Sequence, residues 1–147
     1  MSKLIKFITI LAVSATLCTS GCVFNDKEQN EQAVEVLAMS AASQAVYSSL
    51  QKHPEYEQGY VKLVEVLKKI DVSIDMTPED ISNKVSAELK KYVPEDYVFI
   101  ITGAIDAFFT KYNIGWSDKV NKDKIHLYIE DMIIAIEVAI EENKNRK

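Results

Sequence analysis

Residues 97–112, YVFIITGAIDAFFTKY, form the most hydrophobic stretch of the chain outside its N-terminus. At about 100° per residue, the apolar side chains of such a helix cover more than half of its circumference. These side chains are Tyr97, Val98, Ile100, Ile101, Ala104, Ile105, Phe108, Phe109 and Tyr112. Thr102, Gly103 and Asp106 occupy the remaining stripe. The stretch is shorter than the ~20 apolar residues of a membrane span, and Asp106 interrupts it. We therefore expect a helix in the middle of a helical bundle, with Asp106 on its single solvent-facing stripe.

Signals for helix ends stand on both sides of this stretch. Pro94-Glu95-Asp96 precedes it, and a proline in the first turn followed by acids favours a helix start. Asn113-Ile114-Gly115 follows it, and we expect Gly115 to be the left-handed residue that ends the helix. Thr77-Pro78-Glu79-Asp80 repeats the start signal upstream, with Thr77 as the capping residue. The apolar face of the helix that begins there is Ile81, Val85, Leu89, Tyr92 and Val93.

Two further helices are expected before Thr77. The first runs to about Lys52 and stops before Pro54, and its many small residues indicate that neighbours pack on two of its sides. Pro54 suits the first turn of the second. The apolar residues of that second helix recur at helical spacing as Tyr56, Tyr60, Leu63, Val64, Leu67 and Ile70.

The last predicted helix starts at Ser117 or Asp118 and runs toward the C-terminus. Its main apolar face consists of Ile125, Tyr128, Ile129, Met132, Ile133, Ile136 and Ile140. Leu127, Ile134 and Val138 fall on the opposite side, beside several acids. Taken together, the sequence predicts an all-α fold in which residues 33–147 form a single bundle of four to five helices.

The composition agrees with a helical domain. The chain has 147 residues, the length of one domain, and 48% of them are hydrophobic, which is enough for a core. It contains only 4 glycines and 3 prolines, so few tight turns are expected. Its formal net charge of −5 disfavours binding to nucleic acid or to an anionic lipid surface, because both would repel it.

The N-terminus is typical of a targeting segment. Lys3 and Lys6 precede an apolar run, residues 7–17, which has the length of a signal-peptide core and is too short to span a membrane. The small residues Thr19, Ser20 and Gly21 then lead to Cys22. This Thr-Ser-Gly-Cys ending resembles the lipobox of bacterial lipoproteins, in which a small residue precedes the cysteine that receives lipid. The resemblance covers about the first 22 residues.

The resemblance implies cleavage between Gly21 and Cys22, with acyl chains on the new N-terminal cysteine that hold the protein at a membrane. Residues 1–21 are then the signal peptide. Residues 22–32 are the lipidated cysteine with a polar tether, although the end of this segment also suits the frayed start of the first helix. Cleavage removes Cys18, and it removes Lys3 and Lys6 but no acid, so the net charge falls from −5 to −7.

The residue after the cysteine bears on localisation. Val23 stands where many lipoproteins retained at the inner membrane carry Asp. We therefore expect the outer membrane, facing the periplasm, in a host with two membranes, and otherwise the outer face of the cell membrane. Two alternatives are a secreted protein that is cut near Gly21 and keeps the Cys22 thiol, and a retained membrane anchor.

Few residues of the sequence are candidates for catalysis or metal binding. His53 and His126 are the only histidines, and neither has a Cys or His at the spacing of a metal site. Asp106 stands in an apolar helix, but its helical neighbours are polar or small, which favours a solvated position over a buried functional acid. No phosphate-binding loop or nucleophile motif is present in the sequence. We predict no catalytic residue, no metal and no cofactor, and hence a protein that is not an enzyme.

Two surfaces are candidates for binding a partner. The stripe of Leu127, Ile134 and Val138 would accept an amphipathic helix with basic flanks if it is exposed; the alternative is that the first helix covers it. Tyr112 and Trp116, with Ile114 between them, carry aromatic side chains of the kind that anchor interfaces, and the alternative is that they close a helix pair.

The leading hypothesis for function is a membrane-anchored, non-catalytic binding or scaffolding module of the bacterial envelope. By analogy alone, it is similar to type II secretion pilotins and to exclusion lipoproteins. One alternative is a carrier of a small apolar ligand, which needs a pocket lined by Phe108, Phe109, Tyr97 and Met132. The other is an envelope hydrolase, which needs a cleft that holds Asp106 or His126 beside a second titratable group. The oligomeric state stays open.

Overall fold

The computed structural model describes residues 27–146 and divides them into five α-helices and one short 3-10 turn. The α-helices are α2 (Lys27–Lys52), α3 (Glu57–Leu67), α4 (Pro78–Leu89), α5 (Glu95–Lys111) and α6 (Lys122–Asn145), and the turn is η1 (Pro54–Tyr56). Within these residues an isolated bridge between Met76 and Val120 is the sole β-type pairing. The predicted all-α bundle is confirmed. The predicted signal peptide and Cys22 lie outside the described residues.

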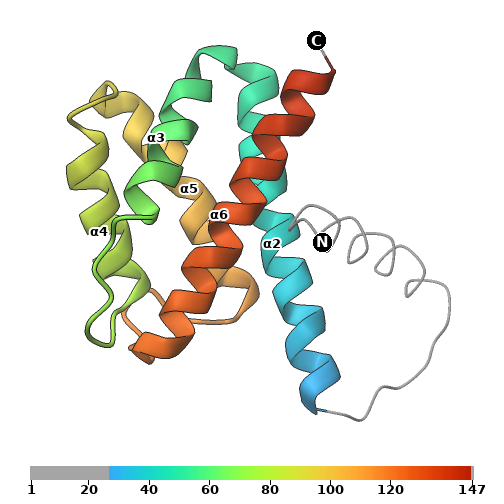
Figure 1. Cartoon of the computed structure of the whole chain (residues 1–147), viewed down its shortest axis with the longest axis vertical. Coiled ribbons are helices and arrows are strands. Elements are labelled where there is room, and N and C mark those ends of the chain that lie inside the picture. The colour runs from blue at the N-terminus through green and yellow to red at the C-terminus, as the bar shows by residue number, and fades with distance from the viewer. Residues whose placement is uncertain (1–26, 147) are drawn as a thin grey trace, which may run out of the picture.

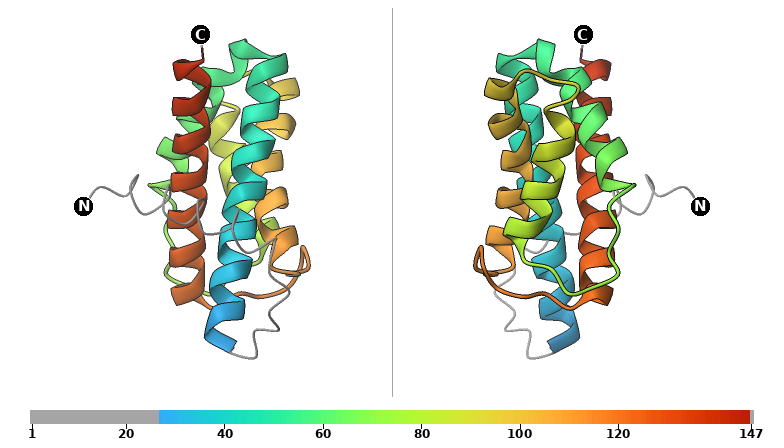
Figure 2. Two further views of the ribbon diagram at one scale, coloured as in Figure 1. Left: turned by 90° about the vertical axis from the view of Figure 1, so that its right-hand side faces the viewer. Right: turned by 90° about the vertical axis from the view of Figure 1, so that its left-hand side faces the viewer.

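Helix α2 contacts other helices of the bundle on two of its sides. It packs against α6 on one side and against α5 on the other, as the predicted two-sided packing requires (Figure 1). α2 and α6 run in the same direction, while α5 runs against them (Figure 2). α4 packs on α5, and α3 lies over α4 and α6. Residues 27–32 already belong to α2, so they are the start of the first helix and not a tether.

The predicted helix start at Thr77 is confirmed in detail. The Thr77 hydroxyl accepts the Asp80 N–H at 3.0 Å, and the Asp80 carboxylate accepts the Thr77 N–H at 2.9 Å. Pro78 is the first residue of α4. The hydrogen bonds from the backbone and side chain of Thr77 lower the pKa of the Asp80 carboxyl below its usual value. This reciprocal capping fixes where α4 begins.

The segment between α5 and α6 differs from the prediction at both of its ends. Asn113, with φ 53°, is the left-handed residue after α5, and Gly115 is not left-handed. Asparagine tolerates this conformation better than most residues with a side chain. The Asp118 carboxylate accepts the Gly115 N–H at 2.6 Å and so closes a turn instead of starting a helix. α6 begins only after Asn121, whose side chain accepts the Asp123 N–H at 2.8 Å.

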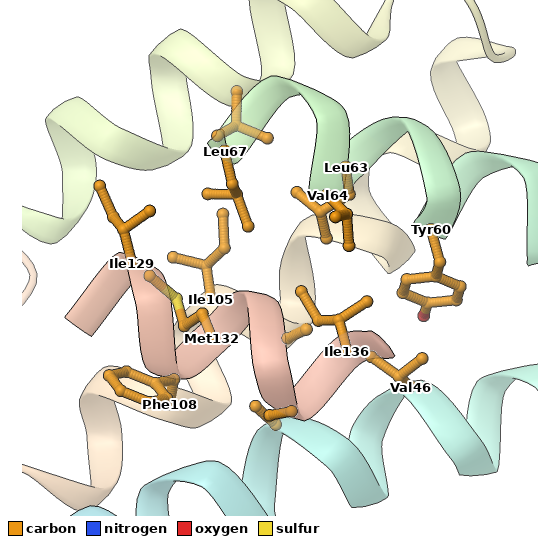
Figure 3. Packing of buried hydrophobic residues seen from close by; sticks show 14 of the residues in the cluster. Val46, Tyr60, Leu63, Val64, Leu67, Ile105, Phe108, Ile129, Met132 and Ile136 are labelled. Carbon is orange, nitrogen blue, oxygen red and sulfur yellow. The ribbon is translucent and has the colours of Figure 1, made fainter. Parts of the chain in front are cut away.

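The core is filled by side chains from all five described α-helices. Figure 3 shows Ile129, Met132 and Ile136 of α6 facing Leu63, Val64 and Leu67 of α3, with Ile105 and Phe108 of α5 and Val46 of α2 around them. Phe108, Ile105, Met132 and Ile136 are fully buried. Burial of such side chains contributes about 1.5–3 kcal/mol each to folding.

Helix α5 buries one face and exposes the other, which the hydrophobic count alone did not predict. Ile100, expected on the apolar surface, is 39% exposed, and Phe99 is 84% exposed. Thr102, expected on the polar stripe, is buried and donates its hydroxyl hydrogen to the carbonyl oxygen of Val98 at 2.9 Å. That bond satisfies the hydroxyl inside the core. Asp106 is exposed, as the solvated alternative predicted.

Within residues 27–146, every helix is too short or too polar to cross a lipid bilayer. This holds for α5 as well, in agreement with the prediction from Asp106 and from the length of the apolar stretch.

Candidate functional site

A groove of about 330 Å³ opens between the end of α3 and the exposed side of α6. It forms because the chain leaves α3 after Leu67 and its next residues turn across α6, which places Ile70 and Val72 opposite the helix. The volume is at the lower end of the ~300–1,000 Å³ of small-ligand sites. The groove is lined by Leu67, Lys68, Ile70, Val72, His126, Ile129, Glu130, Ile133, Ile134 and Glu137.

The groove combines an apolar floor with a charged rim. Six of its ten lining residues are Leu, Ile or Val, and the other four are charged or titratable. Lys68 bridges the opening, since its Nζ lies 2.7 Å from the Glu137 Oε1. Both side chains of this ion pair are about half exposed. Water therefore screens the pair, and it holds the rim only weakly.

Acidic side chains line the exposed face of α6 from end to end. Asp123, Glu130, Glu137 and Glu141 are all exposed. Their spacings of seven and four residues place them within about 40° of one another around the helix. Leu127 lies on one side of this acidic row, and the floor of the groove, which includes Ile133 and Ile134, borders the row. The surface therefore presents apolar strips beside a continuous negative stripe.

The structure separates the three residues of the predicted partner-binding stripe. Leu127 is 60% exposed, Ile134 is half-buried at the groove, and Val138 is 8% exposed inside the core. α2 packs along α6, as the packing alternative proposed. Leu127 and Ile134 are thus available to a partner, and Val138 is a core residue.

The groove itself was missed by sequence reasoning. Its floor joins Ile70 and Val72 to Ile133, more than 60 residues further along the chain. Ile133 was assigned to the main apolar face of its helix, and Ile70 to the end of another. Nothing in either local pattern indicates that the two segments leave a gap between them.

The structure also separates the two aromatic residues of the second predicted partner-binding surface. Tyr112 is half-buried, with its ring centroid 4.4 Å from that of Tyr128 and 5.3 Å from that of Phe108. These contacts join α5 to α6, as the helix-closing alternative proposed. Trp116 is exposed, and its carbonyl oxygen accepts the Glu79 N–H at 3.1 Å.

An acidic residue that the sequence did not single out lies beside these rings. Asp131 on α6 is half-buried, and burial raises the pKa of its carboxyl to about 7, with smaller contributions from the negative charges of Glu35 and Glu130. Burial also raises the pKa of the Tyr112 and Tyr128 hydroxyls. A half-buried carboxyl among other acids binds a proton more tightly than a solvated one.

The remaining candidates lie apart from one another. His53 stacks on Tyr56 with ring centroids 4.7 Å apart, and its Nδ1 lies 3.1 Å from the Glu55 Oε1. Asp106 is exposed on α5, and His126 lies at the groove beside Glu130. Across residues 27–146, no three His, Cys, Asp or Glu side chains are grouped as metal ligands.

The four residues of the predicted ligand pocket do not meet. Phe108, Phe109 and Met132 are packed into the core, whereas Tyr97 lies 11 residues before Phe108, about 16 Å away along α5, with its ring against Tyr56. A filled core is the arrangement that counts against a carrier of apolar ligands.

Comparison with known proteins gives no relative: no protein-family model, curated protein or solved structure matches the chain.

Proposed function

We propose that this chain is a lipid-anchored protein of the bacterial envelope that works as a non-catalytic binding module. In this proposal Cys22 carries the lipid. The groove between α3 and α6 holds an amphipathic helix of an envelope protein. The observation that carries the binding role is the groove itself, an apolar floor next to the acidic row of α6.

The anchor would hold the bundle close to the membrane. Lys27, where α2 begins, is five residues after Cys22. Five extended residues reach at most about 17 Å. A tether this short keeps the groove within reach of partners in or on the same membrane. It also raises the effective concentration of such partners relative to free solution.

A helix fits the groove in length and in charge. The groove follows α6 from His126 to Glu137, a rise of about 16 Å or three helical turns. A partner helix with apolar residues at every third or fourth position would cover Ile70, Ile133 and Ile134. Lys or Arg on its flanks would face Glu130, Glu141 and their neighbours. Electrostatic complementarity of this kind selects a basic partner and speeds its association.

Site-specific photo-crosslinking of the full chain in bacterial cells tests the groove. A photoreactive residue at Ile134 is expected to capture a segment with helical apolar spacing and basic flanks, identified by mass spectrometry of the crosslinked peptide. Glu130→Lys is expected to reduce this capture about tenfold by reversing the charge at the rim. Glu88→Lys on α4, which also reverses an exposed acid, is the matched control and should leave capture unchanged. An acidic or non-helical captured segment contradicts the proposal, and so does equal loss in both variants.

Labelling with a palmitate analogue tests the anchor separately. Wild-type protein and Cys18→Ser should both incorporate the label, and Cys22→Ser should incorporate none. If all three chains are cleaved and none is labelled, the protein is secreted with a free Cys22 thiol and the anchor proposal is wrong. The crosslinking result at the groove does not depend on this outcome.

The alternative function, an envelope hydrolase, would need a catalytic residue in the same groove. It would rely on His126, which lies at the groove with Glu130 but whose side chain takes part in no hydrogen bond or ion pair among the described residues. A catalytic histidine is normally oriented by a hydrogen-bonded partner. Under the binding proposal, His126→Ala keeps most of the crosslinked product. A loss of function with unchanged capture would favour the hydrolase.

A further inference from the structure

The outward face of α5 carries an apolar surface that no part of residues 27–146 covers. Phe99, 84% exposed, and Ile100 stand next to each other near the start of the helix. One turn further on is Gly103, where an added Cβ atom would meet nothing within 4 Å. Ala107 follows after another turn. The face thus has a large apolar side chain at one end and a shallow, small-residue surface in the middle.

The two ends of the same face carry opposite charges. Asp96 lies in the first turn of α5 and Lys111 in the last, and both are exposed. Neither forms an ion pair within the described part of the chain. Glu95 differs from them, because its carboxylate lies 2.7 Å from the Lys90 Nζ. Each end of the face therefore has an unpaired charge that the other end would neutralise.

We infer that α5 is the dimerisation face of this protein, and that it pairs with α5 of a second copy in the antiparallel direction about a two-fold axis near Gly103. In a two-fold interface the same patch serves both copies, so it must be complementary to itself. In the antiparallel pair, Phe99 of each copy packs over the small surface at Gly103 and Ala107 of the other. Asp96 of each copy then faces Lys111 of the other at both ends.

Two other coverings of this face fit less well. In a parallel pair, Asp96 would meet Asp96 and Lys111 would meet Lys111, so like charges would repel at both ends. An anionic membrane surface would be repelled by Asp96 and Asp106, which lie on either side of Phe99 along the helix. Of these three coverings, only the antiparallel pair sets Phe99 on a small surface and Asp96 beside Lys111.

The inference is independent of the groove, because no residue of α5 lines it. It has one geometric consequence if the anchor proposal also holds. An antiparallel pair directs the two α2 starts to opposite ends of the dimer. Two copies anchored in one membrane would then lie with their helices along the bilayer surface.

Disulfide crosslinking tests the arrangement. The full chain with Cys18 and Cys22 replaced by Ser has no thiol, so one added cysteine reports one position. Gly103→Cys lies near the two-fold axis and should give a covalent dimer on mild oxidation. Ala107→Cys should give little, because the two copies of residue 107 are about 12 Å apart along the helix axes. Equal crosslinking at both positions indicates a parallel pair, and no crosslinking at either indicates a monomer. Both results overturn the inference.

Charge reversal distinguishes a specific contact from loss of folding. In the Gly103→Cys background, Asp96→Lys should lower the covalent dimer about tenfold, and adding Lys111→Asp should restore it. Phe99→Asp should also abolish the dimer, whereas Leu127→Asp, a matched change at another exposed apolar residue, should not. Failure of the double reversal to restore the dimer contradicts the antiparallel pairing.

Discussion

The two ends of the interface between α2 and α6 are built from different interactions. At the end near the C-terminus, Gln51 Nε2 donates to the Oδ1 of the buried Asn143 at 2.9 Å. There the Arg146 guanidinium lies 5.3 Å from the centroid of the Tyr47 ring. At the opposite end, where α2 begins, burial raises the pKa of Asp131 and the nearby charge of Glu35 adds to the rise, and the Tyr112 and Tyr128 rings pack against each other. The first end is held by a hydrogen bond between side chains, although the buried Nδ2 of Asn143 has no partner among the described residues. The second end places like charges beside an aromatic cluster.

This difference shows which forces hold α2 at each end. At the C-terminal end a hydrogen bond between side chains fixes the register of α2 against α6. At the start of α2, the charges oppose the contact, and burial of aromatic rings must supply the stability. That end is also the one that follows Cys22, the proposed anchor, in the sequence. The contact of α2 with α6 near its start should therefore depend on pH more strongly than the contact at the C-terminal end.

The largest expected effect comes from breaking the aromatic cluster. Phe108→Ala removes a fully buried ring whose centroid lies 5.9 Å from that of Tyr128. We expect a loss of about 3–5 kcal/mol in the free energy of unfolding, measured by urea denaturation. Leu127→Ala, an exposed control on α6, should change it by less than about 0.5 kcal/mol. A loss below about 1 kcal/mol for Phe108→Ala would mean that the ring does not hold this end of the bundle.

A smaller effect is expected at the C-terminal end from Gln51→Ala. Gln51 is exposed, so the change removes little packing, but it leaves the buried Oδ1 of Asn143 without its donor. We expect a loss of about 1–2 kcal/mol in the free energy of unfolding. Gln44→Ala is the matched control on the same helix, since its hydrogen bond to Ser48 is exposed. Equal effects from the two substitutions would show that the Asn143 contact contributes nothing specific.

The smallest effect, at the start of α2, has a distinctive pH dependence. The pKa of the folded Asp131 carboxyl, about 7, lies above its ordinary value of 3.8. The folded state therefore binds the proton more tightly, and stability falls as pH rises from about 4 to about 7. The charges that act on Asp131 are those of Glu35 on α2 and Glu130 on α6. The neighbouring hydroxyls are those of Tyr112 and Tyr128, on which Glu31 of α2 also acts.

Asp131→Asn should accordingly stabilise the protein at pH 8 by about 1 kcal/mol, a value reduced because water screens this half-exposed carboxylate. At pH 5 only the unfolded carboxyl is ionised, and about a third of the span between the two pKa values has been crossed, so the gain should be about a third as large. Urea denaturation at the two pH values measures the difference. Asp106→Asn, on the exposed stripe of α5, should change the stability by less than about 0.5 kcal/mol at both. A gain for Asp131→Asn that is the same at pH 5 and pH 8 would falsify the electrostatic account.

Local patterns were sufficient for the helices and for the start of α4 at Pro78, whereas Pro54 opens a 3-10 turn and α3 begins only at Glu57. Thr77 and Asp80 cap α4 through hydrogen bonds between residues that are three positions apart. Because the whole motif is local, the sequence was enough to predict this cap. The turn after α5 was predicted less well. The choice between Asn113 and Gly115 as the left-handed residue depends on the Asp118 carboxylate and on the pairing of Val120 with Met76, which is 44 residues away.

The sequence by itself predicted an all-α bundle of four to five helices and the solvated position of Asp106, because these follow from spacings of three and four residues within one segment. It also supplied the whole basis for expecting lipid on Cys22. Only the tertiary structure decided that Val138 is core while Leu127 is exposed, that Ile70 faces Ile133 across a groove, and that the Phe99 side chain is left exposed by the described part of the chain. Those outcomes depend on how helices distant in sequence pack against one another. The periodicity of one helix defines its apolar side but not which neighbour, if any, will cover it.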